Sequence, residues 1–210
     1  MASVTRRRRS PDASRRSRVE EQILAATERL LGGGEGFTDL GVQRIADEAG
    51  VARSSFYVIF PDKTALLLRL VRGLKQALLE IAVEWRPDAP ENGLAELAAT
   101  YARMLAFYRQ HAGVIAAASE VATYDAAARE VWDDYLDAFA CETATRIKAE
   151  QEAGHTAGDM DPVLAARVAV WGGDRLMVRH VTERPADEDE ALARELAASR
   201  WFSLYRRPSL

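Results

Sequence analysis

The sequence predicts an all-α protein of about nine helices, because apolar residues recur every three or four positions along its 210 residues. Nowhere does this spacing give way to the apolar–polar alternation of a half-buried strand. Helix breakers separate the runs, at Gly32-Gly33-Gly34, Gly50, Pro87, Gly154 and Pro185.

The first 63 residues predict an arm and a small three-helix domain. Residues 1–16 hold almost nothing that can be buried, which predicts a flexible basic arm. Ser17-x-x-Glu20 is a capping box at the start of the first helix, which ends at Gly32. Two shorter helices follow at about 42–49 and 53–60, so we expect the domain to span residues 17–63.

Residues 64–210 predict a second, larger helical domain. Asp62 caps its long first helix, which ends before Pro87. Asp161-Pro162 begins a later helix, because Pro suits the first helical position after a cap. The remaining helical runs cover residues 92–111, 114–121, 125–153 and 187–205.

The composition excludes several classes of protein. The hydrophobic fraction of 48% is too high for disorder along the whole chain, and no stretch approaches the roughly 20 apolar residues of a membrane helix. The Arg-rich N-terminus lacks the apolar segment of a secretory signal. The one cysteine, Cys141, forms no internal disulfide, and we expect it to be a buried structural thiol. A cytoplasmic protein without a membrane partner is therefore expected.

Charge is divided unevenly between the two ends of the chain. The net charge of −4 argues by itself against nucleic acid. Residues 1–72, however, carry 13 Lys and Arg against 9 Asp and Glu, whereas the rest carries 15 against 23. This asymmetry predicts a basic functional end on an acidic body.

Residues 42–60 have the pattern of a helix-turn-helix, in which the second helix enters the DNA major groove. Ala46 is small where two helices cross, and Gly50 suits the positive φ at the end of the first helix. The second helix exposes hydrogen-bonding and basic side chains but no acid. An ordinary αα-hairpin is the alternative, which the basic arm disfavours.

The segment from Ile45 to Leu67 resembles the signature of the TetR/AcrR family of bacterial regulators. It reads Ile-Ala-Asp-Glu-Ala-Gly-Val-Ala-Arg-Ser-Ser-Phe-Tyr-x-x-Phe-x-x-Lys-x-x-Leu-Leu. The resemblance covers residues 17 to about 75. It implies a ligand-responsive repressor that binds a pseudo-palindromic double-stranded DNA operator as a homodimer. A more distant likeness to a mycobacterial repressor of this family rests on Val131-Trp132 through Phe139, Asp174-Arg175 and Trp201 to Tyr205.

The resemblance also implies which side chains contact DNA. Arg53 is the candidate for base recognition, because a guanidinium reaches O6 and N7 of guanine together. Ile59 departs from the family, which often has a phosphate contact there; it either touches a thymine methyl or packs inside. The Arg-rich arm either replaces that contact or is only a solvated tail. The implied DNA-binding residues are Gln43, Arg44, Arg53, Ser54, Ser55, Tyr57 and Lys63, of which Tyr57 and Lys63 are expected to hold the phosphate backbone.

Large side chains recur at helical spacing in the second domain. Periodicity alone favours an ordinary core, whereas the resemblance implies a cavity for a small apolar effector. The candidate lining residues are Met104, Phe107, Tyr108, Trp132, Tyr135, Leu136, Phe139, Trp171 and Asp174. Asp174 is either a polar group in the pocket or, as we rather expect, the partner of Arg175 or Arg179. Gly172-Gly173 within a helix predicts a close helix crossing or a close approach of ligand.

The last two helices are where members of the family form their dimer interface. Alanines there allow close packing, and the apolar anchors are typical of interfaces. The expected contact residues are Ala169, Ala197, Trp201 and Leu204.

Nothing in the sequence indicates an enzyme. The three histidines, His111, His155 and His180, lack metal-ligand spacing, and the Gly32 to Gly36 segment lacks the Lys-Ser/Thr of a phosphate-binding loop. We expect no cofactor and no metal. Two alternatives remain: a DNA-binding regulator without a small-molecule ligand, acting as an activator or under a partner's control, and a helical enzyme.

Overall fold

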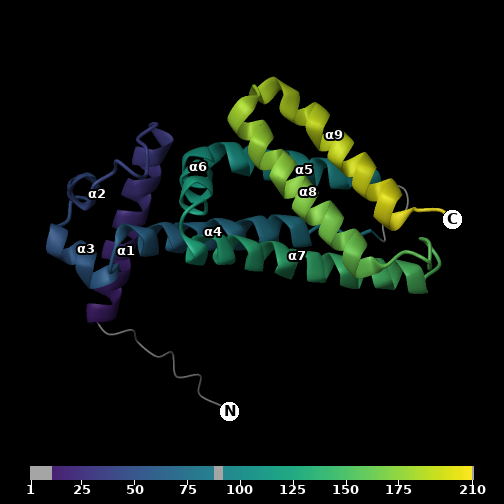
Figure 1. The fold of residues 1–210 in the computed structure, drawn as a ribbon, viewed down its shortest axis with the longest axis horizontal. Coiled ribbons are helices and arrows are strands. Elements are labelled where there is room, and N and C mark those ends of the chain that lie inside the picture. The colour runs from purple at the N-terminus through teal and green to yellow at the C-terminus, as the bar shows by residue number, and fades with distance from the viewer. Residues whose placement is uncertain (1–10, 88–91, 210) are drawn as a thin grey trace, which may run out of the picture.

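The computed structural model describes residues 11–87 and 92–209, and in this part of the chain all regular secondary structure is helical, as predicted (Figure 1). The small N-terminal unit comprises α1 (Pro11–Gly32), α2 (Val42–Ala49) and α3 (Arg53–Ile59). The body comprises α4 (Lys63–Val83), α5 (Gly93–Gln110), α6 (Ala112–Val121), α7 (Ala126–Glu152), α8 (Pro162–Glu183) and α9 (Asp189–Arg200). Short helical turns, η1 (Ala186–Glu188) and η2 (Trp201–Tyr205), flank α9.

Helix α1 begins earlier than the sequence predicts. Its first residue is Pro11, so residues 11–16 belong to the helix, and residues 1–10 of the expected arm lie outside the described residues. Ser17 does not cap the helix, because it lies inside it and its hydroxyl donates to Glu21 Oε1 at 3.2 Å. Proline is well accommodated in a first helical turn, which explains the earlier start. The predicted capping box is therefore wrong.

The N-terminal unit is held by a small apolar core. Ile23 of α1, Ile45 of α2 and Phe56 of α3 are fully buried. Gly50 ends α2 with a φ of 67°, in the left-handed region predicted for it. These contacts fix α3 across α2 and leave one face of α3 exposed.

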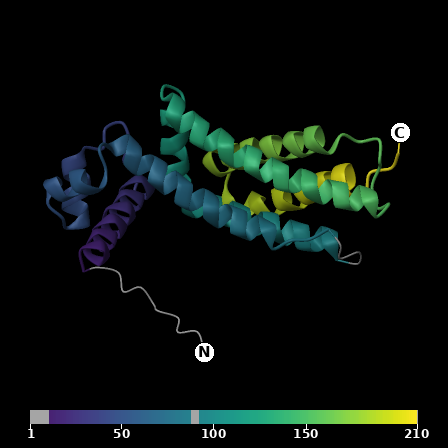
Figure 2. The same cartoon turned by 90° about the horizontal axis from the view of Figure 1, so that it is seen from below.

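Helix α4 joins the N-terminal unit to the body and runs along much of its length (Figure 2). Asp62 caps it as predicted, accepting from the backbone N–H of Ala65 at 2.7 Å. In the body, α5 packs on α9 and α7 packs on α8, while α4 contacts α5, α6 and α7. A shift of α4 would therefore displace both α3 and the helices in the middle of the body.

Helix α6 is a second connection between the two units, which the sequence did not predict. It packs against α1 so closely that a Cβ on Gly113 would lie 2.4 Å from the carbonyl oxygen of Leu31. The hydroxyl of Thr38 donates to the Glu120 carboxylate on the same side. Both connections fix the position of α1 to α3 relative to the body.

Candidate DNA interface and effector pocket

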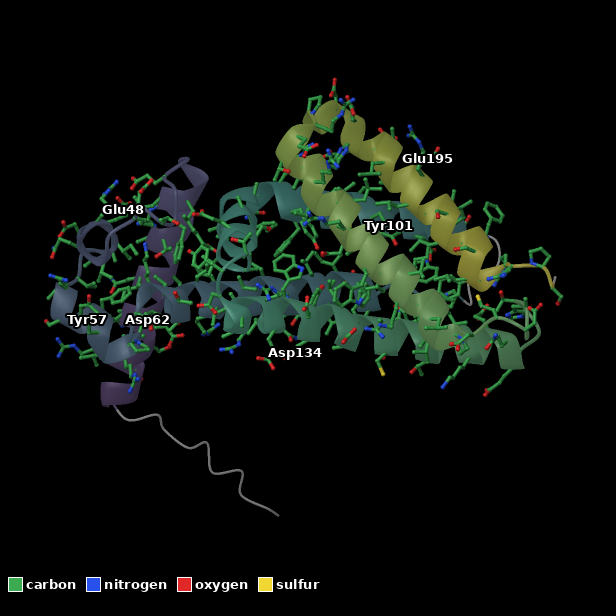
Figure 3. The ribbon with its side chains drawn as sticks, in the orientation of Figure 1. Glu48, Tyr57, Asp62, Tyr101, Asp134 and Glu195 are labelled. Atoms are coloured by element: carbon green, nitrogen blue, oxygen red, sulfur yellow. The ribbon has the colours of Figure 1, made fainter. Side chains whose placement is uncertain are left out.

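Helix α3 presents an outward face at the tip of the N-terminal unit. Phe56 is buried, whereas Tyr57 is 47% and Val58 66% exposed. Figure 3 shows Tyr57 at the end of the molecule that is farthest from the body. Arg53 and Ser54 are exposed, and Ser55 is half-buried. Ile59 is half-buried and packs against the core, which favours packing inside over contact with a thymine methyl.

Arg53 is available to bind an external acceptor. Its guanidinium lies 5.7 Å from the ring centre of Tyr57, and among the described residues no carboxylate pairs with it. A guanidinium without a carboxylate partner at the start of a helix suits hydrogen bonding to a base edge in the major groove.

The candidates on α2 are engaged with carboxylates. Gln43 donates to Asp47 at 2.7 Å, and Arg44 pairs with Glu35 at 3.0 Å and with Glu48 at 3.3 Å. The hydrogen bond to Glu35 contributes most to raising the pKa of Arg44 above its usual value. These groups are exposed, so their ion pairs are weak and a phosphate can replace them.

Lys63 has a structural role that the sequence did not predict. Its ammonium donates to the carbonyl oxygens of Phe37 at 2.9 Å, Thr38 at 2.6 Å and Leu40 at 3.5 Å. All three N–H donors are therefore used to hold the loop before α2 against α4. A direct phosphate contact from Lys63 does not fit this arrangement.

A pocket of about 300 Å³ opens between α6, α7 and α8. Its walls include four of the expected lining residues, Trp132, Leu136, Trp171 and Asp174. Leu136 and Asp174 also border a second, much smaller space of about 10 Å³, which is lined by Met104, Tyr108, Tyr135 and Phe139. Phe107 lines neither space; it packs on His111, with ring centres 4.4 Å apart.

Asp174 is a buried polar group of the pocket, with an exposed fraction of 7%. It accepts hydrogen bonds from the Tyr108 hydroxyl at 2.6 Å and from Trp132 Nε1 at 3.3 Å. Burial raises the pKa of this carboxyl, although both hydrogen bonds oppose the shift. The favoured ion pair is wrong: Arg179 pairs with Glu183 at 2.8 Å, and no ion pair joins Asp174 to Arg175 in the described part of the chain.

Lys75 of α4 is a buried basic residue next to the pocket that sequence analysis missed, and it packs against Trp132 of the pocket wall. Only 6% of it is exposed, and its ammonium donates to the carbonyl of Val131 at 2.9 Å. The same ammonium lies 4.3 Å from the ring centre of Trp132 and 4.8 Å from that of Tyr135. Burial lowers the pKa of Lys75 to about 7, despite the attraction of Asp174. The only hint in the sequence is one lysine within the apolar stripe of α4.

The expected dimer residues are mostly buried within the chain. Ala197 is 0%, Trp201 7% and Leu204 3% exposed, so these three side chains have little surface left for contact with a second copy. Trp201 packs beside Trp85, where a Cβ on Gly93 would come within 2.5 Å of it. Alanine-rich helices are apolar on both sides, so periodicity does not tell which side faces the chain's own core.

Helix α8 instead carries an exposed apolar stripe. Leu164 is 60%, Val168 76% and Leu176 46% exposed, at a spacing of four or eight residues that places them on one face. Gly172 continues the stripe, and half-buried Ala169 lies beside it. A groove of about 410 Å³ runs between α8 and the end of α9, next to this stripe.

One further expectation for the body is wrong: Cys141 is not buried but exposed, because it lies on the outward side of α7. A Cβ on Gly172 or Gly173 would meet nothing within 4 Å, so no helix of the same chain crosses closely there, and the alternative of a close approach of ligand stays a prediction. Among residues 11–87 and 92–209, no group of three His, Cys, Asp or Glu is arranged to hold a metal ion, and no helix is long and apolar enough to cross a membrane.

Both the N-terminal unit and the body match families of known proteins. Residues 23–70 match the family profile of bacterial regulatory proteins, tetR family, and residues 98–205 match the C-terminal domain of the transcriptional regulator EthR. The chain belongs to the tetR family. This tetR-family protein is therefore a DNA-binding transcriptional regulator, and the resemblances of residues 45–67 and of the C-terminal part are confirmed.

The regulator is similar to proteins of several bacteria and an archaeon. It is 28% identical to the HTH-type transcriptional regulator EthR of Mycolicibacterium smegmatis, over 97% of this chain and 95% of that protein. A TetR transcription regulator from Haloarcula marismortui has a TM-score of 0.71 at 23% identity, covering 90% of this chain and 99% of that one. A transcriptional regulator from Saccharomonospora viridis, in complex with choline, has a TM-score of 0.70 at 20% identity, covering 92% and 99%. The two structures show the same fold.

Proposed function

We propose that this regulator is a repressor that binds a pseudo-palindromic DNA operator as a homodimer and is released by a small, largely apolar effector. The observation that carries the proposal is the position of α6. This helix lines the pocket through Ala118 and Ser119 and also packs on α1 of the DNA-binding unit at Gly113. Acting on DNA, the regulator would work in the bacterial cytoplasm.

Recognition of the operator is assigned to α3. Arg53 reads a base edge, Ser54 and Ser55 contact bases or phosphates, and Tyr57 contacts the backbone. Exposure of this face and the unpaired guanidinium support the assignment. Gln43 and Arg44 on α2 exchange their present carboxylate partners for phosphate oxygens.

Dimerisation is assigned to the exposed stripe of α8. One short recognition helix reads only a few base pairs, whereas two helices related by a two-fold axis read an inverted repeat. A second copy would cover Leu164, Val168 and Leu176, which are otherwise exposed to water. Gly172 would let the two α8 helices approach closely, which explains a glycine that has no close neighbour within its own chain.

Release from DNA follows from the two connections between the units. An effector that enters between α6, α7 and α8 moves α6, and with it α1 and the spacing of the paired α3 helices. Effector and operator then weaken each other's binding, typically by about 1–3 kcal/mol. Aromatic and aliphatic side chains around the pocket support a largely apolar effector.

A pocket-filling variant tests this coupling without knowledge of the effector. Ala122 is half-buried in the pocket wall, so Ala122→Trp places a large apolar side chain where an effector would bind. Tyr124→Trp is the matched control, since Tyr124 is 64% exposed and outside the pocket. The operator is first recovered from random DNA duplexes, and affinity is then measured by fluorescence anisotropy. We expect Ala122→Trp to weaken operator binding about 5- to 150-fold and the control to leave it unchanged.

The alternative is a DNA-binding regulator that has no small-molecule ligand. It predicts that a folded Ala122→Trp protein binds the operator as tightly as the unaltered protein does. That result would exclude control through this pocket.

A further inference from the structure

The ammonium of Lys75 occupies a cage of the type that binds organic cations. The ring centres of Trp132 and Tyr135 lie 4.3 and 4.8 Å from it, and the Asp174 carboxylate accepts a hydrogen bond from the indole N–H of the same Trp132. Aromatic faces combined with a carboxylate attract cations, most strongly where water is excluded. The Lys75 ammonium therefore occupies the position that a bound cation would take.

The cage holds Lys75 by few direct bonds. An ammonium has three N–H donors, and the hydrogen bond described for Lys75 is the one to the Val131 carbonyl. The cost of burying this cation is visible in its pKa, which falls to about 7. A displaced Lys75 would have other partners, because the carboxylates of Asp133 and Asp134 on α7 both attract its ammonium. Asp134 points away from the body in Figure 3.

The cage borders the open pocket between α6, α7 and α8. Trp132 and Asp174 belong to both, and Trp171 Nε1, also at the pocket, is buried without a hydrogen-bond partner in the described structure. Two basic residues share the pocket wall: Arg129, which is bonded to the carbonyl of Ala122, and the exposed Arg175. Asp133 and Asp174 balance their charge, so the wall as a whole does not repel a cation.

We propose that the effector carries an organic ammonium group on an apolar body, and that this group displaces Lys75 from the Trp132–Tyr135–Asp174 cage. This inference rests on the proposed function and names the class of effector. Displacement breaks the bond between Lys75 and Val131, which ties α4 to the end of α7 nearer the DNA-binding unit. Because α4 also carries Lys63, which holds the loop before α2, loosening α4 alters the placement of the DNA-binding helices.

Binding of a simple cation tests the proposal. The probe is benzyltrimethylammonium, and its neutral carbon isostere, neopentylbenzene, is the comparison. Binding to the full chain is followed by tryptophan fluorescence, since Trp132 and Trp171 both line the pocket. We expect the cation to bind at least about tenfold more tightly than the isostere, which is the size of a desolvated cation–π and carboxylate contribution.

Three variants separate the cage from general effects on folding. Lys75→Met removes the competitor and is expected to tighten binding of the cation about tenfold or more, while Asp174→Asn is expected to weaken it by a similar factor. Lys148→Met, at an exposed lysine of α7, is expected to change nothing. Circular dichroism and melting temperature establish that each variant is folded. A gain of affinity in Lys75→Met is not expected from a merely damaged fold.

Two results of the binding measurements would overturn the proposal: equal binding of the cation and its isostere, or an unchanged cation affinity in folded Lys75→Met. Measurements of operator affinity distinguish failure of the cage from failure of the proposed function. If the neutral isostere, but not the cation, weakens operator binding, an apolar effector stands and the cage is excluded. If the cation binds as expected but leaves operator affinity unchanged, the cage is established and release from DNA through it is excluded.

Discussion

The contact between α6 and α1 leads to a prediction for Gly113→Ala. A Cβ at this position would lie 2.4 Å from the carbonyl oxygen and 2.5 Å from the carbonyl carbon of Leu31, and 2.9 Å from the backbone nitrogen of Gly32. All three are backbone atoms, so no side chain can rotate away. To reach an ordinary separation of about 3.4 Å, α6 and α1 must move apart by about 1 Å.

The expected cost is the difference between two effects. Overpacking costs about 1–3 kcal/mol, and alanine regains up to about 1 kcal/mol over glycine as a helix former. Gly113 is only the second residue of α6, where this gain is smaller than in a helix interior. We therefore expect a net destabilisation of about 1–2 kcal/mol. For a chain of this size, that lowers the melting temperature by about 2–8 °C.

Gly73→Ala is the matched control. Gly73 is exposed in the interior of α4, and its Cβ would meet only Arg69 Nη1, at 3.9 Å. This variant should be more stable than the unaltered protein by about 0.5–1 kcal/mol. Thermal unfolding of both variants, followed by circular dichroism, measures the contrast. A Gly113→Ala protein as stable as Gly73→Ala would refute the close packing of the two units.

Three other substitutions have specific expected outcomes. Arg53→Ala should weaken binding to the true operator by about 1–3 kcal/mol and relax specificity at one base pair, as measured by anisotropy on single-base operator variants; an unchanged ratio of operator to random-DNA affinity would contradict base recognition by Arg53. Val168→Glu should give a monomer in analytical ultracentrifugation, whereas Tyr124→Glu, also at an exposed position, should not; a dimeric Val168→Glu protein would exclude the α8 stripe as the interface. Asp189→Asn should make the free energy of unfolding fall less steeply as the pH is lowered. Hydrogen bonds from Arg109, at 2.6 Å, and then from His180 lower the pKa of Asp189 below its usual 3.8. Its contribution is therefore present above about pH 5 and lost as the pH falls through the lowered pKa. Urea unfolding at pH 3 to 6 measures this free energy, and an equal dependence of it on pH in both proteins would count against the ion pair.

Features that depend on local sequence could be predicted well. Gly50 takes the left-handed conformation, Asp62 caps α4, and residues 42–60 form the helix-turn-helix, because each is determined by residues within one or two turns. The aromatic residues near the pocket were also predictable, since helical spacing places Trp132, Leu136 and their neighbours on an inward face.

Features that depend on which helices meet could not be predicted in this way. Lys75 is buried only because α7 brings Trp132 and Tyr135 across it, more than fifty residues away in the chain. The contacts of Lys63 with the carbonyls of Phe37 and Thr38 could not be predicted, because these partners belong to a loop more than twenty residues earlier in the chain. The burial of Trp201 within its own chain could not be predicted either, because periodicity does not distinguish an apolar face that meets the chain's own core from one that meets another molecule.

Selection of bound sequences from a pool of random DNA duplexes tests the central claim most directly. The full chain is used at moderate salt, beside the Val168→Glu variant. We predict that the unaltered protein enriches an inverted repeat whose half-sites are separated by about one helical turn or a multiple of it, and that the variant enriches at most a single half-site. Enrichment of no sequence by a folded, dimeric protein free of bound small molecules would contradict the assignment of an operator-binding homodimer.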